Sequence, residues 1–322
     1  MAESYMFDTD FAHYYGAPVG EAHFRVEWDD FAVDECLPEM SFGEGEHVYL
    51  HIRKRGVNTE WLARQMAQNL GIHPNDVGYC GLKDRHANTT QWFSLYLPKL
   101  KTLDGHALVA SIEGDLQLLQ QERAAKKLRR GMHSSNHFVL RLRAFTGCQR
   151  ELNERLTLIQ QHGVPNYFGE QRFGIESQNL WAARAWLEEK QRIKRNLEGM
   201  YLSALRSYIF NLILRERLKN TPLEQLQTLT GALWGRGRLP AEYEAFETNA
   251  LPPEMLPLMY ALEHKGLNQE RRPLWLAAED LRWEFVAADE VLLSFSLKPG
   301  QYATSLLREC VVLRDMSTKI RI

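Results

Sequence analysis

The chain has 322 residues, 44% of them hydrophobic, and a formal net charge of −2, which suits a globular protein of one large domain or two ordinary ones. No stretch approaches the run of about 18 apolar residues that a membrane-spanning helix needs, and the acidic N-terminal segment lacks the pattern of a signal peptide. The four cysteines form no CxxC pair of the kind used in zinc and redox motifs. We therefore expect a cytoplasmic protein with reduced thiols and no membrane partner.

Charge is distributed unevenly along the chain. Residues 1–50 contain 12 Asp and Glu but a single basic residue, Arg25, so this part carries 1 − 12 = −11. The remaining 272 residues therefore carry −2 + 11 = +9, with basic runs at 51–56, 123–131 and 192–196. One such run is usually a solvated face, but three together favour binding to a polyanion such as a nucleic acid.

Strand patterns dominate the first 145 residues. Apolar and polar residues alternate in "HVYLHIR" (47–53), "QWFSLYL" (91–97) and "HFVLRLR" (137–143). This period of two predicts antiparallel strands with one covered face. A helix is predicted over 58–71, because an Asn/Thr cap precedes apolar residues at a spacing of four and Gly71 stands at its end.

The middle of the chain has a different pattern. Helical spacing and length occur at 177–195 and 199–219, and a looser, proline-bearing region follows from 221 to 270. Strand alternation returns in "VLLSFSLKPG" (291–300). We therefore predict an α/β (α+β) protein in which a strand-rich domain is interrupted by a second, more helical domain.

The most distinctive polar cluster is Lys83-Asp84-Arg85-His86, which follows the strand-like "VGYC" and precedes the strand at 91–97. Loops with rigid flanks often carry functional groups, and flanking cations favour an ionised carboxylate. Asp84 would then suit a nucleophile or a base. The alternatives are a solvated turn with a weak surface ion pair and a metal site, although a D-x-H pair without further ligands is a weak metal pattern.

A second segment, "VPNYFGEQRFG" (164–174), combines glycines, aromatic residues and Arg172. This composition suits base stacking together with phosphate contact. The alternative is a compact loop whose Tyr167 and Phe168 pack at the junction of the two domains. The residues alone favour the packing interpretation.

Both segments resemble signatures of the TruD-type tRNA pseudouridine synthases. The first is "GLKDRHANTTQWFSL" from Gly81 onward, and the second is "GVPNYFGEQRFG" at 163–174. Other segments similar to the family occur in the family's order, and the resemblance thus covers nearly the whole chain. They are "FAVDE" (31–35), "KKLRRG" (126–131), "NHFVLRLR" (136–143), "ALRSYIFN" (204–211) and "PGQYATSLLRE" (299–309).

The resemblance implies an enzyme that isomerises uridine 13, in the D-arm of tRNA, to pseudouridine. The N-glycosidic bond is cleaved and the uracil is reattached through C5, without a cofactor or a metal. The implied fold is a pseudouridine synthase catalytic domain with a largely antiparallel mixed sheet, over 1–162 and 270–322. An inserted TRUD domain would occupy 163–269. We expect the partner to be tRNA, the protein to be a monomer, and no metal to be bound.

The resemblance also implies the roles of individual residues. Asp84 corresponds to the nucleophile, and Arg25 to a basic partner that is usually Lys in the family. Arg pairs bidentately with a carboxylate and keeps its proton, so we expect the role to persist. Attack at C6 of uracil and attack at C1′ of ribose both remain open. The predicted substrate-binding residues are Phe31, Lys83, Asn136, Phe138, Arg172 and Tyr302.

Two rival interpretations come from other functional classes. The first is an RNA-binding or tRNA-folding protein on the same scaffold that has lost the chemistry, and the presence of Asp84, Arg25 and Asn136 argues against it. The second is a metal-dependent hydrolase that uses Asp84 and His86. Activity that survives a chelator would exclude the hydrolase.

Overall fold

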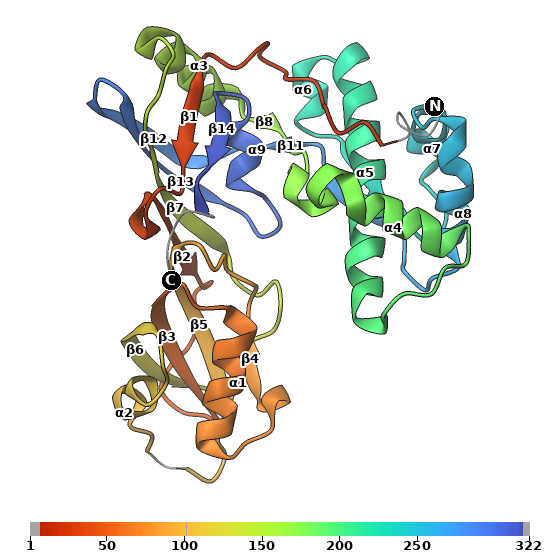
Figure 1. Cartoon of the computed structure of the whole chain (residues 1–322). Helices are drawn as coiled ribbons and strands as arrows, with labels where there is room; N and C mark the ends of the chain where they lie inside the picture. The colour runs from red at the N-terminus through yellow and green to blue at the C-terminus, as the bar shows by residue number, and fades with distance from the viewer. Residues whose placement is uncertain (1–6, 101, 318–322) are drawn as a thin grey trace. The chain divides into compact units, whose positions relative to one another are not determined.

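The structure of the chain is a computed structural model that describes residues 7–100 and 102–317. The chain folds into two compact units (Figure 1). We call one the sheet unit, formed by Val19–Glu154, Ala278–Gln301 and Val311–Ile322. We call the other the helical unit, formed by Met1–Pro18, Arg155–Ala277 and Tyr302–Cys310. The division into a catalytic domain and an inserted domain at 162/163 and 269/270 stays a prediction. Within the described ranges, no helix has the length and apolar character needed to cross a membrane.

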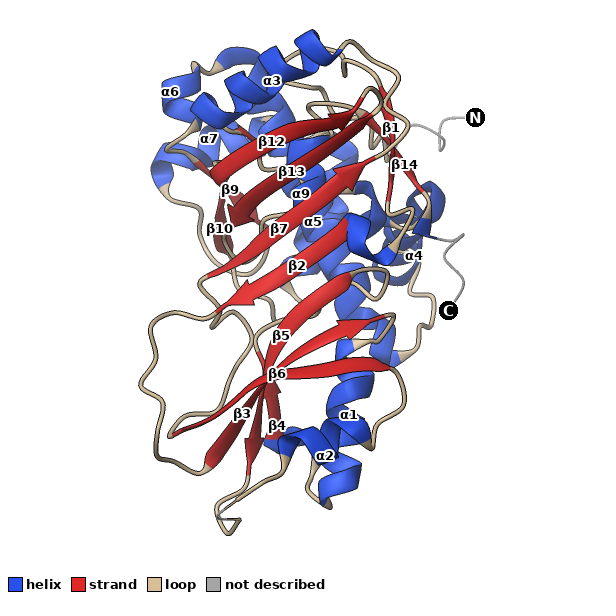
Figure 2. Ribbon diagram, turned by 90° about the vertical axis from the view of Figure 1, so that its left-hand side faces the viewer, coloured by secondary structure: helices blue, strands red, loops and turns tan. Residues whose placement is uncertain are grey.

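The sheet unit is built on one eight-stranded sheet (Figure 2). Neighbouring strands pair in the order β12 (Glu279–Ala287), β13 (Glu290–Leu297), β7 (Ser135–Leu142), β2 (Phe31–Cys36), β5 (Asn88–Tyr96), β3 (His47–Arg55) and β6 (Asp115–Ala124), and β4 (Val77–Tyr79) pairs with β5. The β2–β5 pair is parallel and the other pairs of this sheet are antiparallel. The predicted largely antiparallel mixed sheet is confirmed.

The two halves of this sheet differ in how they are covered. In β13, the alternating Leu293, Phe295 and Leu297 are buried, as a strand with one covered face requires. In β3 and β5 the prediction of a single covered face is wrong, because Tyr49 and Trp92 are buried as well. The helices α1 (Thr59–Leu70) and α2 (Gly105–Ala110) cover one side, and the loop that follows β2 covers the other.

The predicted helix at 58–71 is confirmed as α1, and its ends follow from its sequence. The side chain of Asn58 accepts hydrogen bonds from the backbone N–H groups of Glu60 and Trp61, which otherwise have no partner within the helix. At the other end Gly71 has φ 63°, a left-handed conformation that costs glycine little.

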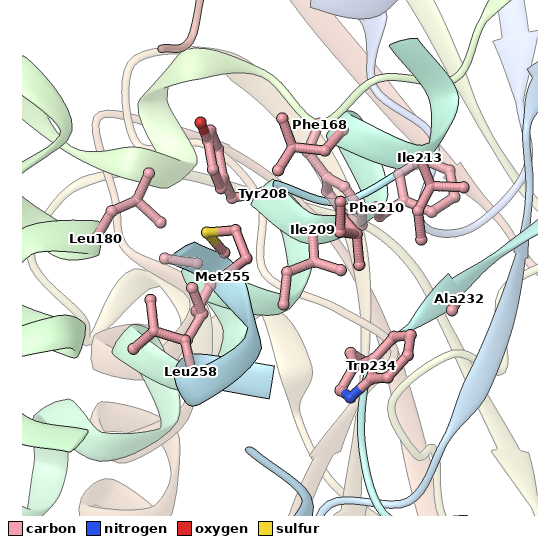
Figure 3. Packing of buried hydrophobic residues seen from close by; sticks show 14 of the residues in the cluster. Phe168, Leu180, Tyr208, Ile209, Phe210, Ile213, Ala232, Trp234, Met255 and Leu258 are labelled. Atoms are coloured by element: carbon pink, nitrogen blue, oxygen red, sulfur yellow. The ribbon is translucent and has the colours of Figure 1, made fainter. Parts of the chain in front are cut away.

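The helical unit has its own hydrophobic core around α5 (Arg195–Asn220). Side chains of α5, including Tyr208, Ile209 and Phe210, pack against Leu180 of α4 (Gln178–Leu187) and Leu258 of α8 (Leu256–Glu263) (Figure 3). Around this core lie α6 (Leu223–Leu226), α7 (Ala241–Asn249), α9 (Ala303–Leu307) and the strand pairs β8 (Val164–Pro165) with β11 (Trp275–Leu276) and β9 (Thr230–Leu233) with β10 (Glu270–Pro273). The region from 221 to 270 is thus more ordered than its composition suggested.

The first predicted helix of this unit is shorter than expected. The pattern predicted a helix over 177–195, but α4 ends at Leu187. The five residues that follow, "EEKQR", offer no apolar side chain to the core, and Lys190 has φ 58°. A helical segment without a buried face gains little from packing, so the chain leaves the helix there.

The remaining elements connect these parts. The helix α3 (Gln149–His162) contains the boundary between the two units. A parallel pair, β1 (Glu21–Phe24) with β14 (Val312–Asp315), belongs to the sheet unit. Short 3-10 helices are η2 (Trp28–Asp30), η3 (Pro74–Asp76), η4 (Glu170–Phe173), η5 (Ile175–Ser177) and η6 (Pro253–Met255).

Candidate active site

Asp84 lies on the loop between β4 and β5, in the sheet unit. Its side chain is 34% exposed, so solvent or a ligand can reach the carboxylate. One carboxylate oxygen, Oδ1, accepts the backbone N–H of His86 at 2.9 Å, and the other, Oδ2, accepts Nη1 of Arg25. With one donor on each oxygen, both oxygens keep a lone pair for a further partner.

Arg25 reaches this carboxylate from a distant part of the sequence. It follows β1, whose parallel partner β14 ends at Asp315 opposite Phe24. Parallel pairing therefore places Arg25 and Asp315 at the same end of the two strands. Arg25 has φ 58°, a strained conformation for a residue with a side chain, and such strain often occurs at functional sites.

The guanidinium of Arg25 is held between two carboxylates. It donates from Nε to Asp315 Oδ1 at 3.2 Å, from Nη2 to Asp315 Oδ2, and from Nη1 to Asp84. The Arg25 side chain is 5% exposed, whereas both aspartates are 34% exposed. Burial acts to raise the pKa of Asp315, but the hydrogen bonds from Arg25 and Ser317 outweigh it and lower that pKa. Asp315 thus orients the guanidinium that contacts Asp84.

Of the predicted substrate-binding residues, Phe31 lies next to this ion pair and Phe138 packs against Phe31, and both rings are buried. The Cζ atom of Arg25 is 5.8 Å from the ring centroid of Phe31, and the centroids of Phe31 and Phe138 are 6.1 Å apart. Asn136 is on β7 two residues before Phe138, so the two side chains share a face of the strand. Asn136 Oδ1 is buried and has no hydrogen-bond partner among the described residues.

Lys83, the residue before Asp84, is directed into the protein. Its side chain is 6% exposed, and its Nζ donates to Oε2 of Glu35, whose side chain is fully buried. Burial raises the pKa of Glu35, and the ion pair with Lys83 opposes this. A second lysine, Lys54, is 1% exposed and donates to the carbonyl oxygen of Val57 at 2.8 Å. Burial, assisted by the charge of Lys83, lowers the pKa of Lys54 to about 8.

The other two predicted substrate-binding residues belong to the helical unit. Arg172 donates from Nε to Ser207 Oγ at 3.2 Å, and its Cζ lies 5.1 Å from the ring centroid of Phe168. The Tyr302 ring packs at 5.9 Å from the Phe168 ring. Arg272 also stacks on Phe168, at 4.0 Å. The structure thus gathers Arg172 and Tyr302 around Phe168.

Reasoning from the sequence missed Asp315. It is 290 residues from Arg25 in the chain and lies in "VVLRDM", which carries no pattern that indicates a polar site. Only the parallel pairing of β1 with β14, a contact between the two ends of the chain, could have identified it. Within residues 7–100 and 102–317, no group of three or more His, Cys, Asp or Glu is arranged to hold a metal ion.

Comparisons with known proteins agree with the resemblance. The family model described as tRNA pseudouridine synthase D (TruD) matches residues 12–183. The tRNA pseudouridine synthase D of Cellvibrio japonicus is 43% identical over 98% of this chain and 96% of its own length. The tRNA pseudouridine synthase D of Shewanella oneidensis is 39% identical over 94% of this chain and 90% of its own.

A solved structure shows the same fold. The crystal structure of a TruD protein from Methanosarcina mazei superposes with a TM-score of 0.63, covering 94% of this chain and 95% of that one at 19% identity. The predicted pseudouridine synthase architecture is thereby confirmed. Because relatives that are 43% and 39% identical match 98% and 94% of this chain, and the family model matches residues 12–183, the chain belongs to the TruD family of tRNA pseudouridine synthases.

Proposed function

We propose that the protein isomerises uridine 13 of tRNA to pseudouridine and that Asp84 is its nucleophile. The observation that carries the proposal is the accessible Asp84 carboxylate, which is held by a buried Arg25 in a chain of the TruD family. The relatives named above are tRNA pseudouridine synthases D. The position in tRNA and the mechanism come from the family resemblance of the Asp84 loop.

The geometry suits the chemistry of such a reaction. An Asp84 oxygen attacks C1′ of the ribose or C6 of the uracil, and the bond between N1 and C1′ breaks. The uracil turns, its C5 bonds to C1′, and the bond between Asp84 and the substrate breaks, which restores the free carboxylate. The proton lost from C5 is balanced by the proton gained at N1, so substrate and product have the same atoms. Attack requires an exposed carboxylate held in place, and the contacts of Asp84 with Arg25 and His86 N supply this.

The surroundings of Asp84 suit a flipped uridine. A base within folded tRNA must leave its stack to reach the carboxylate, at a cost of a few kcal/mol. Phe31 lies beside Arg25, and Phe31 and Phe138 are 8% and 7% exposed, so a flipped base contacts these rings only after neighbouring side chains move aside. The unpartnered Oδ1 of Asn136 is an acceptor for the N3–H of uracil. Arg172 and Tyr302 are further proposed contacts of the RNA. Lys83, whose side chain is 6% exposed and paired with Glu35, is proposed to contribute through the position of its loop.

A basic loop beside the Asp84 loop supports binding to RNA phosphates. The backbone N–H of Gly131 donates to the carbonyl oxygen of Cys80 at 2.7 Å, which ties the loop after β6 to the start of the Asp84 loop. This basic loop exposes Lys126 and Arg129. Contacts with RNA phosphates would release counterions, so binding should weaken as salt rises, with a slope of about 0.7 per neutralised phosphate of a single strand.

The test uses two tRNA transcripts that differ only at position 13, with uridine or cytidine. In buffer with EDTA, we expect the protein to form one pseudouridine, mapped at position 13, in the first transcript and none in the second. Product at another position would contradict the proposed site. Binding of both transcripts without any product would favour the RNA-binding interpretation, and loss of activity in EDTA alone would favour a metal-dependent reaction.

A further inference from the structure

A series of buried hydrogen bonds lies beneath the Asp84 loop and comes from three different elements. Thr59 is at the start of α1, Gln91 is on β5, and Glu35 is on β2. Thr59 and Gln91 are 0% exposed and Glu35 is 3% exposed. Polar groups buried to this degree cost about 1–3 kcal/mol each when they lack a partner, so each partner here restricts where the loop can lie.

The hydrogen bonds of Thr59 and Gln91 form a circuit that starts and ends at the loop backbone. The N–H of Lys83 donates to Thr59 Oγ1 at 3.1 Å, and the Thr59 hydroxyl donates to Gln91 Oε1 at 3.0 Å. The amide of Gln91 then donates from Nε2 to the carbonyl oxygen of Gly81 at 2.5 Å. The backbone N–H of Lys83 and the backbone carbonyl of Gly81 fix the two ends of this circuit. Only one orientation of the Gln91 amide, with Oε1 toward Thr59 and Nε2 toward Gly81, therefore makes all three hydrogen bonds.

Glu35 provides a second anchor for the same segment. Its Oε2 accepts Nζ of Lys83, and its Oε1 accepts the backbone N–H of Trp92 on β5 at 3.1 Å. Lys83 is therefore held by both its backbone and its side chain. Since Lys83 directly precedes Asp84, these bonds fix the direction in which the chain enters the residue that carries the carboxylate.

We propose that Thr59 and Gln91 are positioning residues, whose hydrogen bonds to Lys83 N and Gly81 O hold the Asp84 carboxylate in its reactive place. This inference rests on the proposed function. Neither residue has a hydrogen bond to Asp84 itself, so their effect passes through the loop backbone. A displacement of about 1 Å at a reacting group can cost about 100-fold in rate, which makes such anchors kinetically important.

The first test compares Thr59→Val, which removes the hydroxyl at nearly constant shape, with Thr59→Ser, which keeps it. We expect Thr59→Val to lower the single-turnover rate of pseudouridine formation by about 10- to 100-fold. Its Kd for tRNA should change by less than about twofold, and Thr59→Ser should recover most of the rate. A rate for Thr59→Val equal to or above that of Thr59→Ser would overturn the proposal, because a role in packing alone favours Val, which keeps the branched shape of the side chain.

The sheet unit offers a matched control in Thr89. It is also on β5 and 0% exposed, but its hydroxyl has no hydrogen-bond partner among the described residues. Thr89→Val should therefore keep the wild-type rate. A loss of rate in Thr89→Val as large as in Thr59→Val would show a general effect of altering this core and would also overturn the proposal.

Gln91→Glu provides a second variant in case Thr59→Val folds poorly. It keeps the acceptor for Thr59 but places an oxygen against the carbonyl of Gly81 instead of a donor. We expect a rate loss of about 10-fold or more with tRNA binding retained, and a wild-type rate would contradict the proposal. If the wild type itself forms no pseudouridine, the proposed function fails. If the wild type is active and these variants match it, only the positioning role fails.

Discussion

Two segments of the chain carry the signatures of the TruD family, yet the structure uses their side chains in opposite ways. In the loop from Gly81, the side chain of Asp84, the proposed nucleophile, is exposed and the polar groups beneath it are buried. In the segment 164–174, Tyr167, Phe168 and Phe173 are buried in the apolar core of the helical unit. The first signature therefore presents the proposed nucleophile to solvent, whereas the aromatic residues of the second signature pack the scaffold.

The two units also differ in the side chains that surround a buried arginine. Arg25 in the sheet unit lies between the carboxylates of Asp84 and Asp315. Arg272 in the helical unit stacks on Phe168 and donates to Asn166 Oδ1 at 2.5 Å. Mainly because of burial, the pKa of Arg272 is lowered to about 10, with Tyr302 opposing the shift and Arg172 adding to it. The first arrangement orients a carboxylate, whereas the second stabilises an aromatic cluster.

The largest expected effect among these contrasts is that of Arg25→Met. Without the guanidinium, Asp84 loses a donor and faces the carboxylate of Asp315 with no charge between them. We expect the single-turnover rate to fall by about 10³-fold, or about 4 kcal/mol of barrier. Arg25→Lys should lose less of the rate than Arg25→Met, because it keeps the positive charge. It should stay slower than the wild type, because it lacks the guanidinium fork that contacts both aspartates.

A surface arginine provides the control for this change. Arg55 also pairs with a carboxylate, that of Asp29 at 2.9 Å, but its side chain is 36% exposed. Arg55→Met should retain a rate close to that of the wild type, since exposed ion pairs contribute little. If Arg25→Met is as active as Arg55→Met, Arg25 does not support Asp84 in the reaction.

The second prediction concerns the charge buried beneath the Asp84 loop. Burial lowers the pKa of Lys54 to about 8, whereas in the unfolded chain it is about 10.4. Between these values the unfolded state binds more protons, so the free energy of unfolding should rise with pH, by at most about 3 kcal/mol. Below pH 8 both states are protonated and the full cost of burying the charge remains.

Urea unfolding of the wild type and Lys54→Met at pH 7 and pH 9.5 measures this effect. The wild type should gain stability relative to Lys54→Met as the pH rises. The comparison with the variant cancels the titration of other groups. Parallel pH dependences for the two proteins would show that Lys54 keeps an ordinary pKa and that its burial does not destabilise the fold.

The smallest of these effects is expected in the helical unit. Phe168→Leu removes a ring that contacts Arg272, Tyr302 and Phe210. We expect the free energy of unfolding to fall by about 1–2 kcal/mol, with the single-turnover rate of the folded variant within about threefold of the wild type. A rate loss of 100-fold with unchanged stability would reverse the comparison and give this segment a direct part in the reaction.

Much of the fold follows from local patterns in the sequence. The alternation in "VLLSFSL" predicts β13, and the Asn58 cap and Gly71 predict the ends of α1, because these features act over a few residues. The covering of both faces of β3 could not be predicted in this way. Tyr49 is buried by contact with residues remote in the chain, including Trp92 and the carbonyl of Lys126.

Only some residues of the candidate site could likewise be predicted from the sequence. Asp84 and Arg25 can be recognised from the family's motifs and from the single cation in an acidic segment. Asp315, Thr59 and Gln91 could not be identified as parts of the site, because their relation to Asp84 depends on strand pairing and on hydrogen bonds between distant elements. Buried polar residues have no periodicity of their own, so only the structure shows what they hold.

The measurement that tests the account most directly compares the wild type with Asp84→Asn on a tRNA transcript with uridine at position 13. Asn keeps the size of the side chain and removes its charge, so the comparison isolates the carboxylate. We expect Asp84→Asn to bind the transcript with nearly unchanged Kd and to lose at least about 10⁴-fold in single-turnover rate. Pseudouridine formation by Asp84→Asn at a rate near that of the wild type would contradict the assignment of Asp84 as the nucleophile.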